Sequence, residues 1–193
     1  MKRVLLILLL FVGLSATANE KGVKRLERIA QRYAAMGSYS VSFVLRSGGN
    51  QQSGVMLVNG KNSYMKVADT EVYIGETLRY EVRGASKEII VDRADAYEKE
   101  LLNSLDGFTH IAADYKIEEC VVDGSTAVRL TPKSQGDTIY VILKSDGESI
   151  AKFKYGAGEN LVEVIITKSE KSSQKLPIFS KERYKGFEMI DFL

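Results

Sequence analysis

The 193-residue chain is poor in the residues that most metal and catalytic chemistry needs, with one cysteine, one histidine, two prolines and no tryptophan. A single cysteine and a single histidine cannot supply the ligands of the usual zinc or haem sites. A lone cysteine also excludes a disulfide within the chain. The sequence contains no Gly-x-Ser-x-Gly, phosphate-loop or His-Glu-x-x-His motif. We therefore expect no metal, no cofactor and no catalytic residues.

Few side chains remain as candidates for chemistry. Cys120 follows two acids, which raise the pKa of a thiol, so we expect it to be buried and inert. His110 lies in a predicted loop, where a surface or capping role is the simpler interpretation. Two pairs of acids are interpreted as solvated strand ends, because nothing places them across a cleft. These pairs are Asp92 with Asp95 and Glu118 with Glu119. The rival hypothesis, an enzyme that uses Asp92, Asp95 or His110, requires a polar cleft around them.

Residues 1–18 have the features of a secretory signal peptide. Lys2 and Arg3 precede an apolar run from Val4 to Gly13, and Ala16-Thr17-Ala18 provides a small-x-small site for cleavage before Asn19. The run of about ten residues is too short to span roughly 30 Å of hydrocarbon as a helix. The interpretation favours export to a periplasm over a retained anchor.

The charge of the predicted mature chain is balanced. Removal of residues 1–18 takes away two basic residues and no acids, which leaves 25 of each sign. A nucleic-acid-binding protein normally has a basic excess, so we expect no nucleic acid as a partner.

The hydrophobic pattern changes from a helical to a strand period near residue 37. Residues 20–36 repeat apolar side chains at steps of three and four and precede Gly37, which is typical of an amphipathic helix. From Tyr39 onward the pattern alternates, with turn signals every eight to twelve residues, and predicts about eleven strands. Residues 95–108 interrupt the strands with a second helical pattern. We expect residues 19–193 to form one domain. Its fold class is α+β, with mostly β structure: a strongly curved antiparallel sheet with helices on one side.

One face of the predicted first helix is strongly basic. It carries Lys21, Lys24, Arg25, Arg28 and Arg32. The simpler interpretation is a solvated face. The alternative is a docking surface for an acidic partner or for anionic lipid head groups.

Three stretches together resemble the periplasmic lipoprotein carriers of the Lol pathway, the LolA-like family. They are the helix followed by Tyr39-Ser40-Val41-Ser42-Phe43; Gly75-x-Thr77-Leu78 with Tyr80; and the run from Val128-x-Leu130-Thr131-Pro132-Lys133 through Lys144-Ser145-Asp146-Gly147 to Tyr184-x-Gly186-Phe187-Glu188-Met189-Ile190-Asp191. The resemblance covers nearly all of the mature chain. It implies an incomplete barrel of about eleven strands, capped by helices over an apolar cavity.

The resemblance also implies a function and partners. Such carriers take lipoproteins from an inner-membrane ABC-type release complex, shield their acyl chains, and pass them to an outer-membrane receptor. The sequence departs from the best-known branch at two places. Asn59-Gly60-Lys61 replaces an Arg-Pro pair, and Arg79 replaces a tryptophan in a hairpin. These departures indicate a divergent branch with a different lipid load, a different partner, or no lipoprotein cargo.

Apolar strand positions and the second helical pattern supply the candidate lipid-binding wall, because acyl chains need contact area and little directional bonding. The candidates are Phe43, Leu45, Val55, Leu57, Met65, Val72, Ile74, Tyr80, Leu101, Leu102 and Leu105. We expect a monomer that carries acylated lipoproteins or a lipid. The alternative is an envelope sensor on the same scaffold, which binds a lipid or a regulatory protein without transferring cargo.

Overall fold

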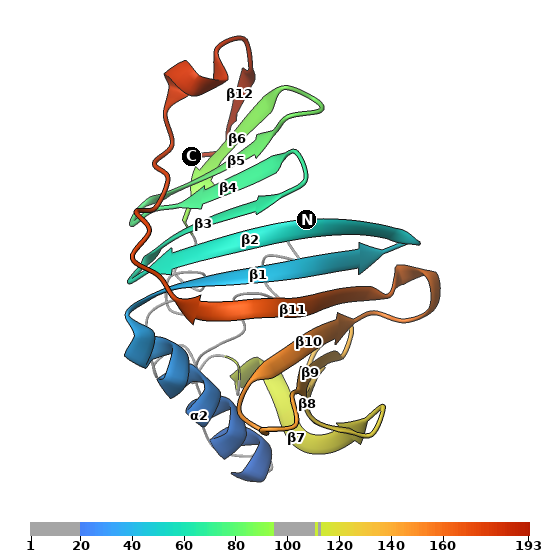
Figure 1. Cartoon of the computed structure of the whole chain (residues 1–193). Coiled ribbons are helices and arrows are strands. Elements are labelled where there is room, and N and C mark those ends of the chain that lie inside the picture. Colours follow the sequence, from blue (N-terminus) through green and yellow to red (C-terminus); the bar gives the residue numbers. More distant parts are fainter. Residues whose placement is uncertain (1–19, 95–110, 112) are drawn as a thin grey trace.

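The computed structural model describes residues 20–94, 111 and 113–193, and its strands form one open, curved sheet (Figure 1). The order across the sheet is β12-β6-β5-β4-β3-β2-β1-β11-β10-β9-β8-β7. The first half comprises β1 (Ser38–Ser47), β2 (Asn50–Asn59), β3 (Asn62–Val67), β4 (Thr70–Ile74), β5 (Leu78–Arg83) and β6 (Glu88–Arg93). The second half comprises β7 (Tyr115–Val122), β8 (Ser125–Pro132), β9 (Ile139–Leu143), β10 (Ile150–Tyr155) and β11 (Val162–Lys171), and the chain ends with β12 (Glu188–Asp191).

The expected fold class is confirmed, with one difference in strand direction. The sheet is a mainly β, open half-barrel, and the 12 strands among the described residues compare with the eleven expected. All neighbouring strands are antiparallel except β12, which pairs with β6 in parallel. The reason is the route of the chain, which crosses the sheet after β11 and reaches its far edge in the direction of β6. The predicted signal peptide and the second helical pattern lie outside the described residues.

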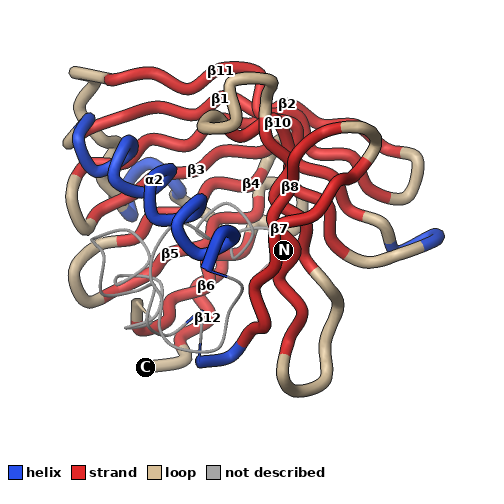
Figure 2. The backbone as a smooth tube through the Cα atoms, turned by 90° about the horizontal axis from the view of Figure 1, so that it is seen from below, coloured by secondary structure: helices blue, strands red, loops and turns tan. Residues whose placement is uncertain are grey.

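Helix α2 (Glu20–Met36) forms at the residues that the periodicity predicts. Its buried side chains include Leu26, Ile29 and Tyr33, which recur on one face. Gly37 ends the helix with a φ of 70°, and its N–H donates to the carbonyl of Ala34. The helix lies nearest to β7 and β8 and extends across the open side of the curved sheet (Figure 2).

The turn signals are found at hairpins. Asp123 and Gly124 both have positive φ, of 51° and 75°, which is the geometry of a two-residue type I′ turn between β7 and β8. The β2–β3 turn is displaced by one residue from the predicted Asn-Gly pair. Asn59 pairs with Asn62, so Gly60 and Lys61 form the turn.

The two faces of the sheet bury separate apolar clusters. We call the face that packs with α2 the helix-side face, and the opposite one the strap-side face. The C-terminal strap, residues 172–187, includes the 3₁₀ helix η2 (Lys181–Tyr184). It places Phe179, Tyr184 and Phe187 against the strap-side cluster. The sheet residues buried in this cluster are Leu57, Tyr64, Tyr73, Val82, Ile89 and Val91. Figure 1 shows the strap in red, extending from the end of β11 to β12. A second 3₁₀ helix, η1 (Gly158–Asn160), lies between β10 and β11.

Candidate functional site

The helix-side face is apolar over strands from both halves of the sheet. The first half contributes Val41, Phe43, Met56, Val58, Met65, Val67, Val72 and Ile74. The second half contributes Ile117, Val128, Leu130, Ile139, Val141, Leu143, Ile150, Phe153, Val164 and Ile166. All belong to one cluster with the buried face of α2, so the helix and the sheet share a single apolar interior.

Five of the eleven candidate wall residues lie on this face. They are Phe43, Leu45, Met65, Val72 and Ile74. Leu45 is half-buried and the other four are buried. Their contact with a lipid stays a prediction, but the structure brings them together as expected.

Three candidates lie on the opposite face, so their assignment to the same wall was wrong. Val55, Leu57 and Tyr80 belong to the strap-side cluster. The error is a shift of one residue, because Met56 rather than Val55 pairs with Val41. The remaining candidates, Leu101, Leu102 and Leu105, lie outside the described residues.

Strand β5 brings charge to the helix-side face. Antiparallel pairing sets Glu81 opposite Val72 and Arg79 opposite Ile74, so these charged side chains continue the apolar rows of β4. Arg79 Nη2 donates to Glu81 Oε2 at 2.7 Å, and both residues are buried. Arg83 Nε donates to the other carboxylate oxygen at 2.8 Å. Burial raises the pKa of Glu81, but the two guanidinium donors outweigh it and hold the pKa below its ordinary value.

The second half of the sheet and α2 supply wall residues that the sequence interpretation missed. The signal that could have found them is the spacing of two between apolar residues in these strands, as in Val128 and Leu130 and in Ile139 and Val141. The candidate set includes no residue of these strands. Arg79 and Glu81 were missed because Leu78, Tyr80 and Val82 alternate with them as a second apolar row.

Polar contacts attach α2 to the rim of the second half. Arg25 forms an ion pair with Glu119 of β7 at 2.9 Å and donates to the carbonyl of Gly147 at 2.9 Å. Arg32 donates to Ser149 Oγ at 3.0 Å and lies 3.8 Å from a carboxylate oxygen of Asp146. Much of the basic helix face therefore pairs with this molecule's own acids and carbonyls.

Phe43 packs over Gly54, its partner on β2. A Cβ at Gly54 would overlap the Phe43 ring and lie 2.9 Å from Val67 Cγ2. The ring therefore occupies the space that any other residue at position 54 would need.

We expect Gly54→Ala to lower the free energy of unfolding by about 1–3 kcal/mol, since overpacking forces the ring from its position. Urea denaturation measures the change. The double variant Phe43→Ala/Gly54→Ala should show a smaller cost than the sum of the two single substitutions. Additive costs would contradict the contact.

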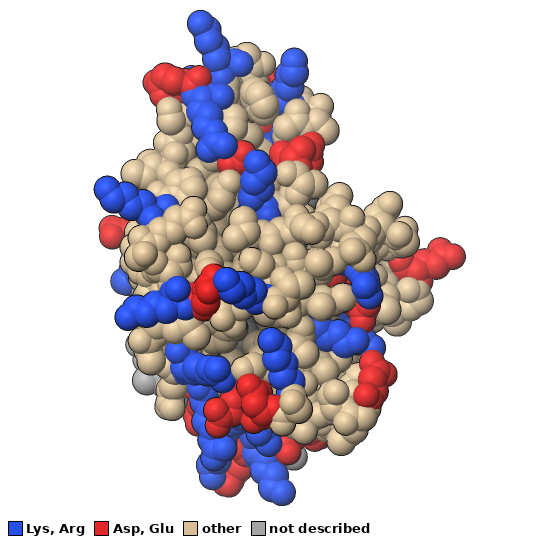
Figure 3. Space-filling view, viewed as in Figure 1, with Lys and Arg blue, Asp and Glu red and all other residues tan. Residues whose placement is uncertain are grey.

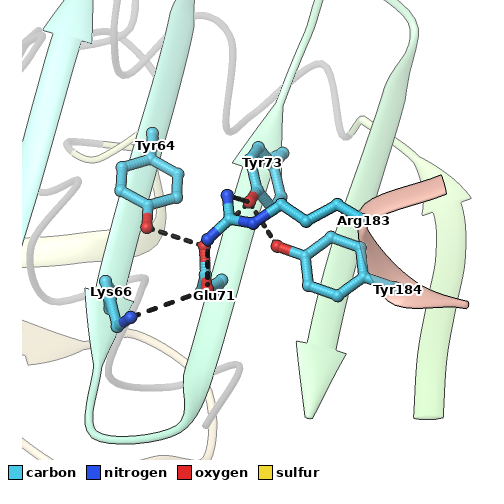
Figure 4. A network of polar contacts seen from close by, with 6 residues as sticks. All are labelled: Tyr64, Lys66, Glu71, Tyr73, Arg183 and Tyr184. Atoms are coloured by element: carbon cyan, nitrogen blue, oxygen red, sulfur yellow. Dashed lines mark hydrogen bonds and ion pairs between the residues drawn. The ribbon is translucent and has the colours of Figure 1, made fainter. Parts of the chain in front are cut away.

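A network of polar side chains fixes the strap to β3 and β4 (Figure 4). The buried carboxylate of Glu71 accepts hydrogen bonds from Tyr64 at 2.7 Å and Tyr73 at 2.8 Å. From the strap, Arg183 Nη2 donates to Glu71 at 3.1 Å, and the hydroxyls of Tyr184 and Tyr73 are 2.5 Å apart. Phe179 stacks on Tyr80 with ring centroids 3.9 Å apart.

The sequence candidates for chemistry show structural roles where they are described. Cys120 is half-buried rather than buried. Burial raises the pKa of its thiol, and the charges of Glu118 and Glu119 act in the same direction, against the opposing charge of Arg129. Glu118 forms ion pairs with Lys116 and Arg129, and Glu119 with Arg25. Asp95 and His110 lie outside the described residues. Within the described ranges, no group of three acidic, histidine or cysteine side chains could hold a metal ion.

A separate groove of about 770 Å³ lies between the β1–β2 and β10–β11 turns. Polar residues such as Arg46, Gln51 and Glu163 line it together with several glycines. This lining is unsuited to acyl chains, so the groove is not part of the apolar wall. None of the helices that the structure describes has the length and apolar character of a membrane crossing.

Comparisons with solved structures find similar chains at low sequence identity. A conserved uncharacterised protein from Thermus thermophilus has a TM-score of 0.55 and 9% identity over 88% of this chain and 98% of its own. A DUF1329 family protein from Desulfovibrio piger has a TM-score of 0.43 and 13% identity over 89% of this chain and 98% of its own. MucB has a TM-score of 0.42 and 15% identity over 87% of this chain, and the match spans 63% of MucB. No protein-family model and no curated protein sequence matches the chain.

The likeness to the Thermus protein concerns the fold alone, because 9% identity transfers no residue role. The other two similarities have TM-scores under 0.5 and add nothing to it. The chain therefore has the fold of an open half-barrel with a helix, and its function must be argued from its own residues.

Proposed function

We propose that this protein is a periplasmic carrier that shelters the acyl chains of a lipoprotein or a lipid against its helix-side face. The observation that carries the proposal is the continuity of this face. Apolar side chains from both halves of an open sheet form one cluster with α2. The resemblance to the LolA-like carriers and the predicted signal peptide support the same function. The proposal requires no cofactor, metal or bond chemistry.

The energetics suit reversible binding. Each CH₂ removed from water contributes about 0.8 kcal/mol, so an acyl chain gains on the order of 10 kcal/mol from an apolar wall. The same wall binds the apolar face of α2 when no chain is present. A cargo chain can then replace Leu26, Ile29 and Tyr33 at the sheet without exposing the wall to water.

The attachment of α2 sets how easily such an exchange occurs. Its polar contacts come from Arg25 and Arg32 and are directed at the rim of the second half. Gly22 allows close approach to β7, because a Cβ there would lie 3.0 Å from the backbone nitrogen of Glu119. The helix is thus anchored beside β7, and the wall of the first half lies away from these anchors.

We expect Gly22→Val to push the helix away from β7 and to raise the association rate of a fluorescent fatty acid roughly tenfold, because about 1.4 kcal/mol of the packing that holds α2 on the wall in the cargo-free protein is lost. Stopped-flow fluorescence measures the rate. Valine has the higher helix propensity, so a loss of stability would come from packing and not from the helix itself. Gln31→Val, at an exposed position of α2, is the matched control and should leave the rate unchanged.

Native mass spectrometry of the protein purified from its own periplasm tests the proposed function. Co-purified acylated protein supports a lipoprotein carrier, and a free lipid supports a lipid shuttle. A transfer assay between inner-membrane and outer-membrane vesicles then separates carrier from sensor. Tight binding of a regulatory protein with no transfer would favour the sensor. A protein that binds neither acyl chains nor an acylated partner would contradict both.

A further inference from the structure

The C-terminal strap exposes an apolar side chain that the packing of the fold does not use. Ile178 is 85% exposed, the largest value among the exposed large hydrophobic side chains of the described residues. Its neighbours Leu176 and Phe179 pack inward against the strap-side cluster. The strap therefore directs Phe179 toward the sheet and Ile178 toward solvent.

The strap is basic, although the predicted mature chain has no net charge. The strap contains four basic residues and one acid. Arg183 pairs with Glu71, and Glu182 accepts a hydrogen bond from Ser180. The three strap lysines are exposed and form no ion pair with any other described residue. They are Lys175, Lys181 and Lys185. Figure 3 shows Lys and Arg side chains gathered over the end of the molecule that carries η2.

The basic residues of α2 differ from those of the strap in what they contact. Arg25, Arg32 and Lys24 lie beside acids of this chain, namely Glu119, Asp146 and Glu20. The intrachain pairs compensate part of the positive charge on α2, whereas the strap lysines face solvent. Of the two basic surfaces, the strap is therefore the better site for an external anion.

A single aliphatic side chain among lysines matches a bilayer better than it matches a protein. Protein interfaces are enriched in aromatic side chains and depleted of lysine at their centre. A membrane surface instead takes lysines, whose stems lie along apolar surface while their ammonium groups reach anionic head groups. The contacts of η2 with Glu71 and Tyr73 hold this surface to the sheet (Figure 4).

We propose that the outer surface of the strap docks on a bilayer containing anionic phospholipid, with Ile178 entering the boundary between head groups and acyl chains. Lys175, Lys181 and Lys185 contact the head groups. The inference rests on the proposed function in one respect: a carrier of acyl chains must come to a membrane to collect or release them. The strap packs on the opposite face of the sheet from the apolar wall, so docking through the strap does not cover the wall.

Co-sedimentation with vesicles tests the proposal on the mature chain. Vesicles of phosphatidylcholine with about 30% phosphatidylglycerol should bind the protein, and pure phosphatidylcholine should bind it far less. Each lysine near an anionic surface accounts for about a fivefold change in affinity, so Lys175→Gln/Lys181→Gln/Lys185→Gln should bind on the order of 100-fold more weakly. Ile178→Ser should bind about tenfold more weakly. High salt should reduce binding of the unmodified protein.

The matched control removes three exposed basic residues elsewhere, Lys24→Gln/Arg28→Gln/Lys144→Gln, and should bind like the unmodified protein. The proposal would be overturned if both triple variants lost vesicle binding equally, or if the strap variant lost none. Equal binding to neutral and anionic vesicles would also overturn it. Uptake of a fluorescent fatty acid in the absence of vesicles is measured on every variant. If uptake persists while the docking prediction fails, the proposed function stands and the docking surface does not.

Discussion

Replacing Glu81 with leucine is expected to lower the free energy of unfolding by about 3–5 kcal/mol, because it removes a buried carboxylate that accepts a hydrogen bond from the buried guanidinium of Arg79. Glu81 is 1% exposed and Arg79 is 4% exposed, so water cannot replace the lost contact. Arg83 also loses its contact with Glu81, but it keeps an ion pair with Glu88 at 3.7 Å and its side chain is 41% exposed, so this loss contributes little. Urea denaturation followed by circular dichroism measures the difference.

The double variant Arg79→Leu/Glu81→Leu is the informative control. Replacing both partners of a buried ion pair by apolar side chains is often nearly neutral, so we expect it to recover most of the lost stability. The two leucines would also extend the apolar wall from β4 onto β5 and should strengthen fatty-acid binding. A double variant less stable than Glu81→Leu would contradict this description of the pair.

Replacing Glu71 with leucine should cost about 2–4 kcal/mol, because two buried tyrosine hydroxyls lose a charged acceptor. Tyr64 and Tyr73 both donate to this carboxylate, and Arg183 reaches it from the strap. The substitution should also loosen the strap. Limited proteolysis should then cleave within residues 172–187 of the variant faster than in the unmodified protein.

The contribution of Glu71 is expected to depend on pH. Burial raises its pKa, but the hydrogen bonds from Tyr64 and Tyr73 and the charge of Arg183 outweigh it, so the folded-state pKa lies below the ordinary value of 4.5. A carboxyl group whose pKa is lowered by folding stabilises the protein above its unfolded-state pKa. That stabilisation is lost as the pH falls through the folded-state value.

The difference in unfolding free energy between the unmodified protein and Glu71→Gln measures this contribution. We expect a full difference at pH 7 and a shrinking one below about pH 4.5. Comparison with glutamine removes the acid sensitivity of the other carboxylates, which both proteins share. A difference that stays constant from pH 7 to pH 3 would show that the charge of Glu71 does not stabilise the fold.

Most of the fold could be predicted because local patterns and tertiary structure agree. The apolar period of residues 20–36 and the glycine after them define α2, and alternation with turn signals defines the strands. The parallel pairing of β12 with β6 could not be predicted in this way. It depends on the path of the strap across the sheet, which no local pattern encodes.

The sequence predicts the strands better than it predicts which face of the sheet each side chain occupies, and β5 shows why. Leu78, Tyr80 and Val82 alternate with Arg79 and Glu81, which predicts an apolar inner face and a charged outer one. The strap covers the first row with Phe179, and the charged row continues the helix-side face beside Val72. A sheet that buries both faces removes the contrast on which alternation depends.

Photo-crosslinking with a diazirine-labelled palmitate, followed by identification of the modified residues by mass spectrometry, tests the central claim most directly. The claim predicts labels on helix-side residues such as Phe43, Met65 and Ile74, and their loss when unlabelled palmitate is added in excess. Labels confined to strap-side residues such as Leu57 and Tyr80, or no label that unlabelled palmitate displaces, would contradict it.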